Sequence, residues 1–317
     1  MIASMGRREG LTNLGDERNE SLMLDKVKFR DVLLRLMSSY KELDALKFFT
    51  LVHQAYEKVI GNSHNKEIIF YHIHNPDTCA QLNFMAFAPQ VKWLVMVREP
   101  IQSCESWIRQ SFEAGDYEVV VVRILTVLFQ VDSVVFNNGD SVGVRLEDLK
   151  RRPKETIRAL CDWMGIIEEK SLYEMTAQGK KWWGDSSSPD LKNDHMKPFG
   201  KASINRQVGS VFSVNDEFIL RTLFYPFNLR FGYADENLEQ FEVNLQIIRP
   251  MLDDMFDFER AIIRETRADT QKFKNSGTYR YLRACLIDRW NVLNEFSTYP
   301  KMLKPLSIDR YINRLQD

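Results

Sequence analysis

The sequence predicts an α/β protein: a mainly parallel sheet flanked by helices, followed by a helical C-terminal extension. Between residues 68 and 233, short apolar runs alternate with segments of helical periodicity, which is the pattern of strand–helix–strand units. After Tyr233 the apolar residues recur only at helical spacing. A chain of 317 residues is long enough to hold one sizeable α/β domain and an appendage.

These patterns divide the chain into a polar N-terminal segment (1–25), an α/β domain (26–234) and a helical extension (235–317). The domain is expected to begin with two helices, centred on residues 32–37 and 48–52. Two apolar stripes predict helices in the extension, the first with Met251, Leu252, Met255 and Ile262, the second with Leu282, Cys285, Leu286 and Leu293.

The stretch KWLVMVREPIQSCES carries the clearest functional signal. Residues 93–97 are predicted to form a buried parallel strand, and Pro100 suits the first turn of a helix. Arg98 would then lie at the carboxyl end of a strand, where open α/β sheets bind ligands, with Ser106 about two turns into the helix. A guanidinium and a hydroxyl beside a helix N-terminus favour an anion such as phosphate. The alternative is an ordinary strand–helix unit whose arginine pairs with a surface carboxylate.

A second apolar run, residues 68–73, is predicted to form a strand that ends at His74, two residues before Pro76. A neutral imidazole at a strand end can act as a general base near pH 7. Alternatively the histidine satisfies backbone groups, or His72 and His74 bind a metal from one face of the strand. No Cys, Asp or Glu cluster with ligand spacing lies nearby in the sequence, so we predict no metal site.

A third strand is expected at residues 142–146, followed by a turn containing Glu147 and Asp148 and a helix over 155–164 that ends at Gly165. The two carboxylates are expected to cap and brace the turn. Farther on, residues 197–210 form a loop rich in glycine and basic side chains, among them Lys201 and Arg206. Ser213 then looks like a helix N-cap followed by acidic first-turn residues.

Together these segments resemble the sulfotransferases that use 3′-phosphoadenosine 5′-phosphosulfate as sulfuryl donor. The resemblance covers residues 27–234 and implies a P-loop-like sulfotransferase fold. It implies that Arg98 and Ser106 bind the 3′-phosphate of the donor and that His74 is the catalytic base. It also implies that Lys201 or Arg206 adds contacts to that phosphate, and that the donor is the only cofactor, without a metal.

The sequence departs from the family pattern at three points. His72 stands where the family usually has lysine, and Leu146 replaces a tyrosine. No Ser-Gly-Thr loop of the kind that cradles the 5′-phosphosulfate precedes His74. The one similar string, residues 274–278, follows a polar segment and is predicted to be a turn between helices, because a phosphate loop needs a strand to present it. The chain is therefore expected to lack the first strand–helix unit of the family.

The leading functional hypothesis is transfer of a sulfuryl group to a hydroxyl or amine of a small-molecule or glycan acceptor. If the chain is truncated, it would be inactive alone. Two alternatives are a catalytically dead module that binds a nucleotide or a protein, and another P-loop-like nucleotide-dependent transferase. The second alternative calls for a Walker lysine loop and an acidic Mg²⁺ ligand, and the sequence shows no such loop.

Composition argues against several other classes. With a formal net charge of −1, the chain as a whole has no electrostatic attraction to nucleic acid or to a membrane surface. The four cysteines are scattered without paired spacing, which favours reduced thiols and a cytoplasmic location. The first 25 residues lack an apolar core suited to a signal peptide. The apolar run 119–136 is interrupted by Arg123, Gln130 and Asp132, so we expect a buried helix there and no membrane span.

Overall fold

The computed structural model describes residues 14–22, 24–62, 66, 68–73, 78–130, 140–183, 198–205, 208–295 and 303–312. The chain groups into two compact units. The first comprises Met1–Val91 and Cys161–Gly200, and the second comprises Lys92–Leu160 and Lys201–Asp317. The boundaries after residues 25 and 234 stay predictions.

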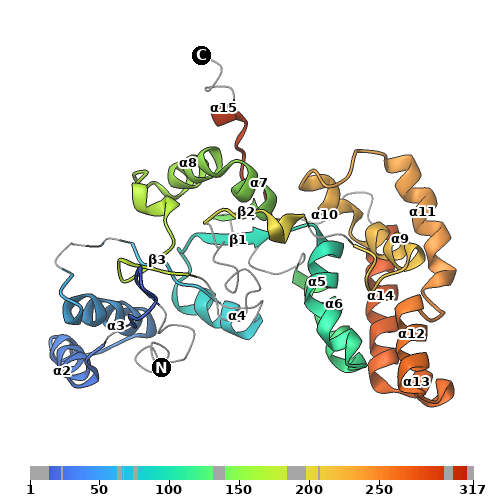
Figure 1. The fold of residues 1–317 in the computed structure, drawn as a ribbon, viewed down its shortest axis with the longest axis horizontal. Coiled ribbons are helices and arrows are strands. Elements are labelled where there is room, and N and C mark those ends of the chain that lie inside the picture. Colours follow the sequence, from blue (N-terminus) through green and yellow to red (C-terminus); the bar gives the residue numbers. More distant parts are fainter. Residues whose placement is uncertain are drawn as a thin grey trace. The chain divides into compact units, whose positions relative to one another are not determined.

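The first unit is mainly helical (Figure 1). Helices α2 (Lys26–Met37) and α3 (Ala45–Val59) confirm the two patterns expected there, and Asp25 and Asp44 cap them by accepting backbone N–H groups of the first turn. The remaining elements are α4 (Thr78–Phe87), the 3₁₀ turn η3 (Lys170–Tyr173), and the antiparallel strands β3 (Thr176–Ala177) and β4 (Lys180–Lys181).

The strand predicted at residues 68–73 is wrong, because this segment is irregular in the structure. Its apolar side chains remain accessible, and Phe70 is 70 % exposed. A strand is stable only when a neighbouring strand completes its ladder of hydrogen bonds, and no neighbour pairs with this segment among the described residues. The Tyr71 ring packs instead on Phe49 and Phe84, with centroid distances of 5.2 and 5.6 Å.

The second unit contains a parallel pair of strands, which confirms the α/β class. Strand β1 (Trp93–Val97) pairs with β2 (Ser141–Arg145) in register from Trp93↔Ser141 to Val97↔Arg145. The other edge of β2 forms a parallel bridge between Gly143 and Pro305. Within the described part of the chain, this parallel sheet is therefore smaller than the sequence patterns suggested.

Two helices follow β1 and lie side by side, α5 (Pro100–Glu113) and α6 (Tyr117–Gln130) (Figure 1). One face of α6 is fully buried, including Val120, Ile124 and Leu128, as expected for the apolar run. In the described segments, no helix combines the length and apolar character needed to cross a bilayer.

After β2 come α7 (Leu146–Arg151) and α8 (Pro153–Met164). Gly165 follows α8 with a φ of +76°, a conformation that glycine adopts without steric strain. This confirms the prediction that the helix ends at Gly165.

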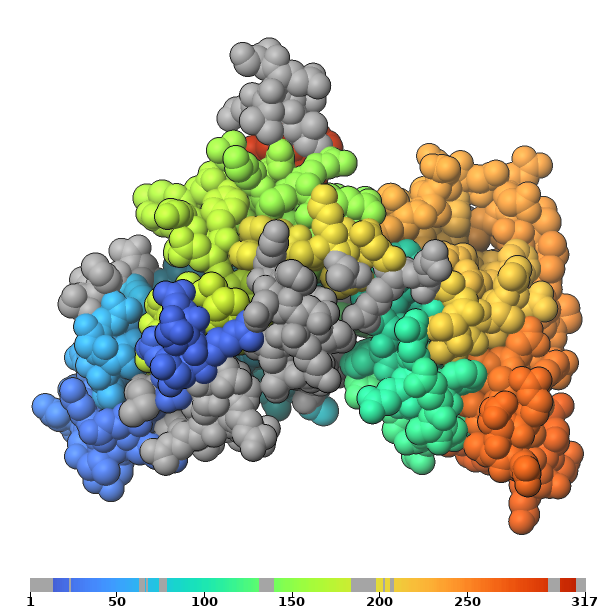
Figure 2. All heavy atoms as spheres, in the orientation of Figure 1, coloured from blue at the N-terminus to red at the C-terminus, as the bar shows by residue number. Residues whose placement is uncertain are grey.

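The C-terminal part of this unit is helical, as predicted, but the predicted stripe of Met251, Leu252, Met255 and Ile262 does not lie on one helix, because residues 252–256 separate two helices. It comprises the 3₁₀ turn η5 (Ala202–Ile204) and helices α9 (Val214–Leu223), α10 (Tyr225–Arg230), α11 (Leu238–Met251), α12 (Asp257–Thr266), α13 (Thr270–Asn275), α14 (Gly277–Glu295) and α15 (Asp309–Ile312). Helix α14 contacts α6, α9 and α11, and Figure 2 shows the later helices (orange) packed into one body. Ser276 joins α13 to α14, so the 274–278 string is the inter-helix turn that its polar context indicated.

Gly143 of β2 lets the side chains of Phe231 and Leu303 approach the strand closely, because glycine has no Cβ atom. A Cβ atom there would lie 2.5 Å from the Phe231 ring and 2.8 Å from a Leu303 methyl group. Because both side chains are buried, we expect Gly143→Ala to lower the free energy of unfolding by about 1–3 kcal/mol through overpacking.

Urea unfolding followed by tryptophan fluorescence measures this loss. Gly277→Ala is the control, because a Cβ at Gly277 meets no atom within 4 Å. Equal stability of the two variants would contradict the expected crowding at Gly143.

Candidate functional site

Arg98 lies where the sequence placed it, at the carboxyl end of a parallel strand. Strand β1 ends at Val97, and α5 begins at Pro100. Glu99 is the N-cap of α5, and its carboxylate accepts the Gln102 backbone N–H at 2.6 Å. The guanidinium therefore emerges at the start of a 14-residue helix, beside the Glu99 carboxylate that caps it, where the helix dipole favours negative charge.

Two groups hold the Arg98 guanidinium. Its Nε donates to Gln102 Oε1 at 3.0 Å, one helical turn away, and a terminal nitrogen donates to the Ser203 carbonyl. Gln102 also donates to the Ile204 carbonyl at 3.4 Å. The turn η5, within the loop predicted to be basic, is thus anchored to the arginine. Lys201 immediately precedes η5 and is exposed, whereas Arg206 lies outside the described residues.

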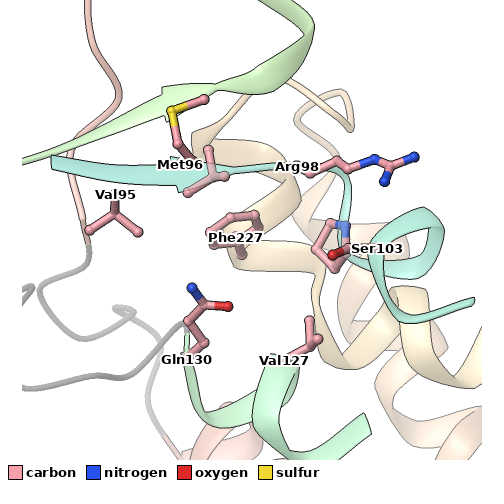
Figure 3. Close-up of a pocket in the computed structure, with 9 residues that line it drawn as sticks. Val95, Met96, Arg98, Ser103, Val127, Gln130 and Phe227 are labelled. Carbon is pink, nitrogen blue, oxygen red and sulfur yellow. The ribbon is translucent and has the colours of Figure 1, made fainter. Parts of the chain in front are cut away.

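A small cavity of about 70 Å³ lies beside Arg98, between β1, α5, α6 and α10 (Figure 3). It is lined by Val95, Met96, Val97, Arg98, Pro100, Ser103, Val127, Gln130 and Phe227. Figure 3 shows the guanidinium extending away from Gln130 and Val127, and both polar and apolar side chains line the cavity. A space of this size holds a few waters or one small group, and not a nucleotide.

Ser103 lines this cavity and was missed in the sequence. Ser106 is partly buried in α5, about 9 Å along the helix axis from Pro100, given a rise of about 1.5 Å per residue. Residues three apart share a helix face, so the two serines form one hydroxyl stripe that begins near Arg98. Ser103 could have been predicted as a site residue, because it lies three residues before Ser106 and therefore on the same face of the helix.

Glu105 fixes a second part of the loop that follows η5. Its side chain is 1 % exposed and accepts backbone N–H groups of three residues: Gly209 at 3.0 Å, Val211 at 2.6 Å and Phe212 at 3.0 Å. The same helix thus binds the loop at two points, through Gln102 and through Glu105. These hydrogen bonds hold the described part of the loop at residues 203–212 in a defined position relative to Arg98 and α5.

The turn predicted at Glu147 and Asp148 is instead the start of helix α7, which has no side-chain cap, and Glu147 braces this segment against neighbouring parts of the chain. Glu147 accepts a hydrogen bond from the Tyr233 hydroxyl at 2.7 Å and a longer one from the Glu99 N–H at 3.4 Å. Burial, reinforced by the Glu147 carboxylate, raises the pKa of Tyr233, so this phenol stays neutral. The guanidinium of Arg145 lies over the Tyr233 ring, 4.6 Å from its centroid. Tyr233 is therefore joined to β2 and to the start of α7.

The Cys104 thiol of α5 is unreactive because it is buried. Complete burial and then the Glu99 carboxylate raise the pKa of the Cys104 thiol, which keeps it protonated. All four cysteines are free, and Cys79 alone among them is exposed. Within the described ranges, no three His, Cys, Asp or Glu side chains gather in a metal-binding arrangement.

The predicted base, His74, lies outside the described residues. His72 is described and exposed, but the segment that carries it is not a strand. The structure therefore brings together Arg98, Gln102 and the η5 loop, with Ser103 in the lining of the adjacent cavity and Ser106 outside that lining. The proposed role of His74 stays a prediction from the family resemblance.

Comparison of the chain with protein-family models, curated proteins and solved structures gives no match. The functional argument therefore depends on the residues and their geometry.

Proposed function

We propose that the Arg98 region binds the 3′-phosphate of 3′-phosphoadenosine 5′-phosphosulfate and that the chain serves sulfuryl transfer. The observation that carries the proposal is the position of Arg98 between the end of a parallel strand and the start of α5, under a loop anchored to the same helix. A guanidinium binds phosphate through paired N–H donors, and the helix N-terminus favours the same charge. A bound phosphate would replace the Ser203 carbonyl as an acceptor for Arg98.

In the reaction that the resemblance implies, an acceptor hydroxyl or amine attacks the sulfur of the donor. The new bond joins the acceptor to sulfur, the bond between sulfur and the 5′-phosphate oxygen breaks, and 3′-phosphoadenosine 5′-phosphate leaves. His74 would receive the acceptor proton. Such in-line transfers depend mainly on positioning and charge stabilisation, which Arg98 and the hydroxyls of α5 would supply at the 3′-phosphate.

A second function, nucleotide binding without catalysis, is favoured by one observation. The segment leading to His74 forms no strand, so the described residues do not present the base from a sheet edge. The two functions agree on nucleotide binding and differ on turnover. Measuring binding and sulfuryl transfer on the same preparation separates them.

Calorimetric titration with 3′-phosphoadenosine 5′-phosphate tests the shared step. We expect micromolar affinity and a loss of about 10- to 100-fold in Arg98→Ala, because a charge-assisted contact contributes about 1.5–3 kcal/mol. Arg109→Ala is the matched control, since Arg109 is an exposed arginine on the same helix.

Adenosine 5′-phosphate, which lacks the 3′-phosphate, should bind the parent chain as weakly as the full nucleotide binds Arg98→Ala. The proposal is wrong if both nucleotides bind alike, or if the folded Arg98→Ala variant keeps the parent affinity.

A further inference from the structure

A second, larger cavity lies between α9, α10 and α11, and it shares with the region described above the side chain of Tyr233. Its volume is about 290 Å³, close to the lower end of small-molecule sites, which span about 300–1,000 Å³. Figure 2 shows an opening between the gold and orange helices. All residues of its lining are described and belong to the second unit.

One wall of the cavity is aromatic and rigid. The rings of Tyr225 and Phe241 stack at 4.6 Å with an interplanar angle of 16°. The Tyr225 hydroxyl accepts the Asn237 N–H at 2.7 Å and donates to the Asp235 carbonyl at 3.2 Å, which fixes the ring. The face of an aromatic ring carries partial negative charge and attracts weakly positive C–H groups.

The remaining wall is rich in side-chain amides. Gln240 and Asn244 line the cavity together, and Gln240 donates to Asn244 at 2.9 Å. Asn228 also lines it, is 4 % exposed, and has an amide oxygen without a hydrogen-bond partner among the described residues. Each amide offers a donor and an acceptor, as a hydroxyl group does, and a buried acceptor without a donor is unfavourable.

The charge balance of the cavity selects against ions. Arg221 is the one charged residue in its lining, and the two terminal nitrogens of its guanidinium pair with Glu99 at 2.8 Å and Glu217 at 3.2 Å. The lining therefore has no uncompensated charge to offset the desolvation of an anionic or cationic ligand.

We propose that this cavity binds a pyranose ring of a neutral saccharide. The C–H face of the ring would lie on the Tyr225–Phe241 wall, and its hydroxyls would exchange hydrogen bonds with Gln240, Asn244 and Asn228. The argument uses none of the residues assigned to the phosphate, so it stands apart from the proposed function.

Saturation-transfer NMR with three methyl glycosides (glucose, galactose and N-acetylglucosamine) tests the proposal, with adenosine, which has no pyranose ring, as the comparison. We expect at least one glycoside to bind with a dissociation constant on the order of 1 mM. Gln240→Ala and Asn244→Ala should each weaken it about tenfold. Gln246→Ala is the matched control, because Gln246 lies on the same helix, outside the cavity lining, and pairs with Asn294.

Three outcomes would overturn the proposal. The first is no transfer from any glycoside to the folded parent chain. The second is equal weakening by Gln240→Ala and Gln246→Ala, which would place the ligand elsewhere. The third is binding of adenosine in preference to every glycoside, weakened by Gln240→Ala, which would assign the cavity to a nucleoside.

Discussion

Replacing Glu105 by alanine should lower the free energy of unfolding by about 3–5 kcal/mol, because it removes the acceptor shared by three buried or half-buried backbone N–H groups. Each donor left unpaired costs about 1–3 kcal/mol, and water entering the site recovers part of that loss. The substitution also leaves a void in α5, where Glu105 is 1 % exposed.

Urea unfolding of the parent, Glu105→Ala and Glu113→Ala checks this expectation. Glu113 is an exposed glutamate at the end of the same helix, and its loss should change stability by less than about 0.5 kcal/mol. Hydrogen exchange adds a local readout, since the amides of Gly209, Val211 and Phe212 should lose protection first. Similar stability of the two alanine variants would show that the carboxylate does not anchor the loop.

Glu259→Ala should be similarly destabilising, by about 3–5 kcal/mol, since it leaves the Arg283 guanidinium buried without its counter-charge. The Glu259 carboxylate is fully buried, and it accepts hydrogen bonds from Arg283, the Tyr117 hydroxyl and the Phe256 N–H. One glutamate therefore joins α6, α12 and α14.

The double variant Glu259→Leu/Arg283→Met separates charge from volume. Replacing both members of a buried ion pair by apolar residues of similar size is often nearly neutral, but here it also leaves the Tyr117 hydroxyl and the Phe256 N–H without their acceptor. We therefore expect the double variant to be more stable than Glu259→Ala and less stable than the parent. Thermal and urea unfolding of the parent, the single variant and the double variant provide the comparison. A double variant as unstable as Glu259→Ala would mean that the unpaired guanidinium does not cause the loss.

The position of the candidate phosphate site was predictable from the sequence. The apolar run before Arg98 and the proline two residues after it are local signals for a strand followed by a helix, and both elements form where expected. The partners of the arginine were not predictable. Gln102 is one turn away, but the Ser203 carbonyl is 105 residues distant, and only folding brings it to the guanidinium.

Glu105 and Glu147 illustrate the same limit. In the sequence Glu105 is one acidic residue within a helix pattern, and nothing local marks it as the acceptor for a loop more than 100 residues away. Glu147 was expected to brace its turn, yet its partnership with Tyr233, 86 residues later, was not foreseen.

The sequence by itself determined the elements that depend on local chemistry. Asp25, Asp44 and Ser213 cap helices, and Gly165 ends one, because capping involves only neighbouring residues. The tertiary structure alone decided which strands pair, which carboxylates become buried acceptors and where cavities form. Residues 68–73 have every local property of a strand and are irregular, since a strand is completed by a partner that its own sequence does not specify.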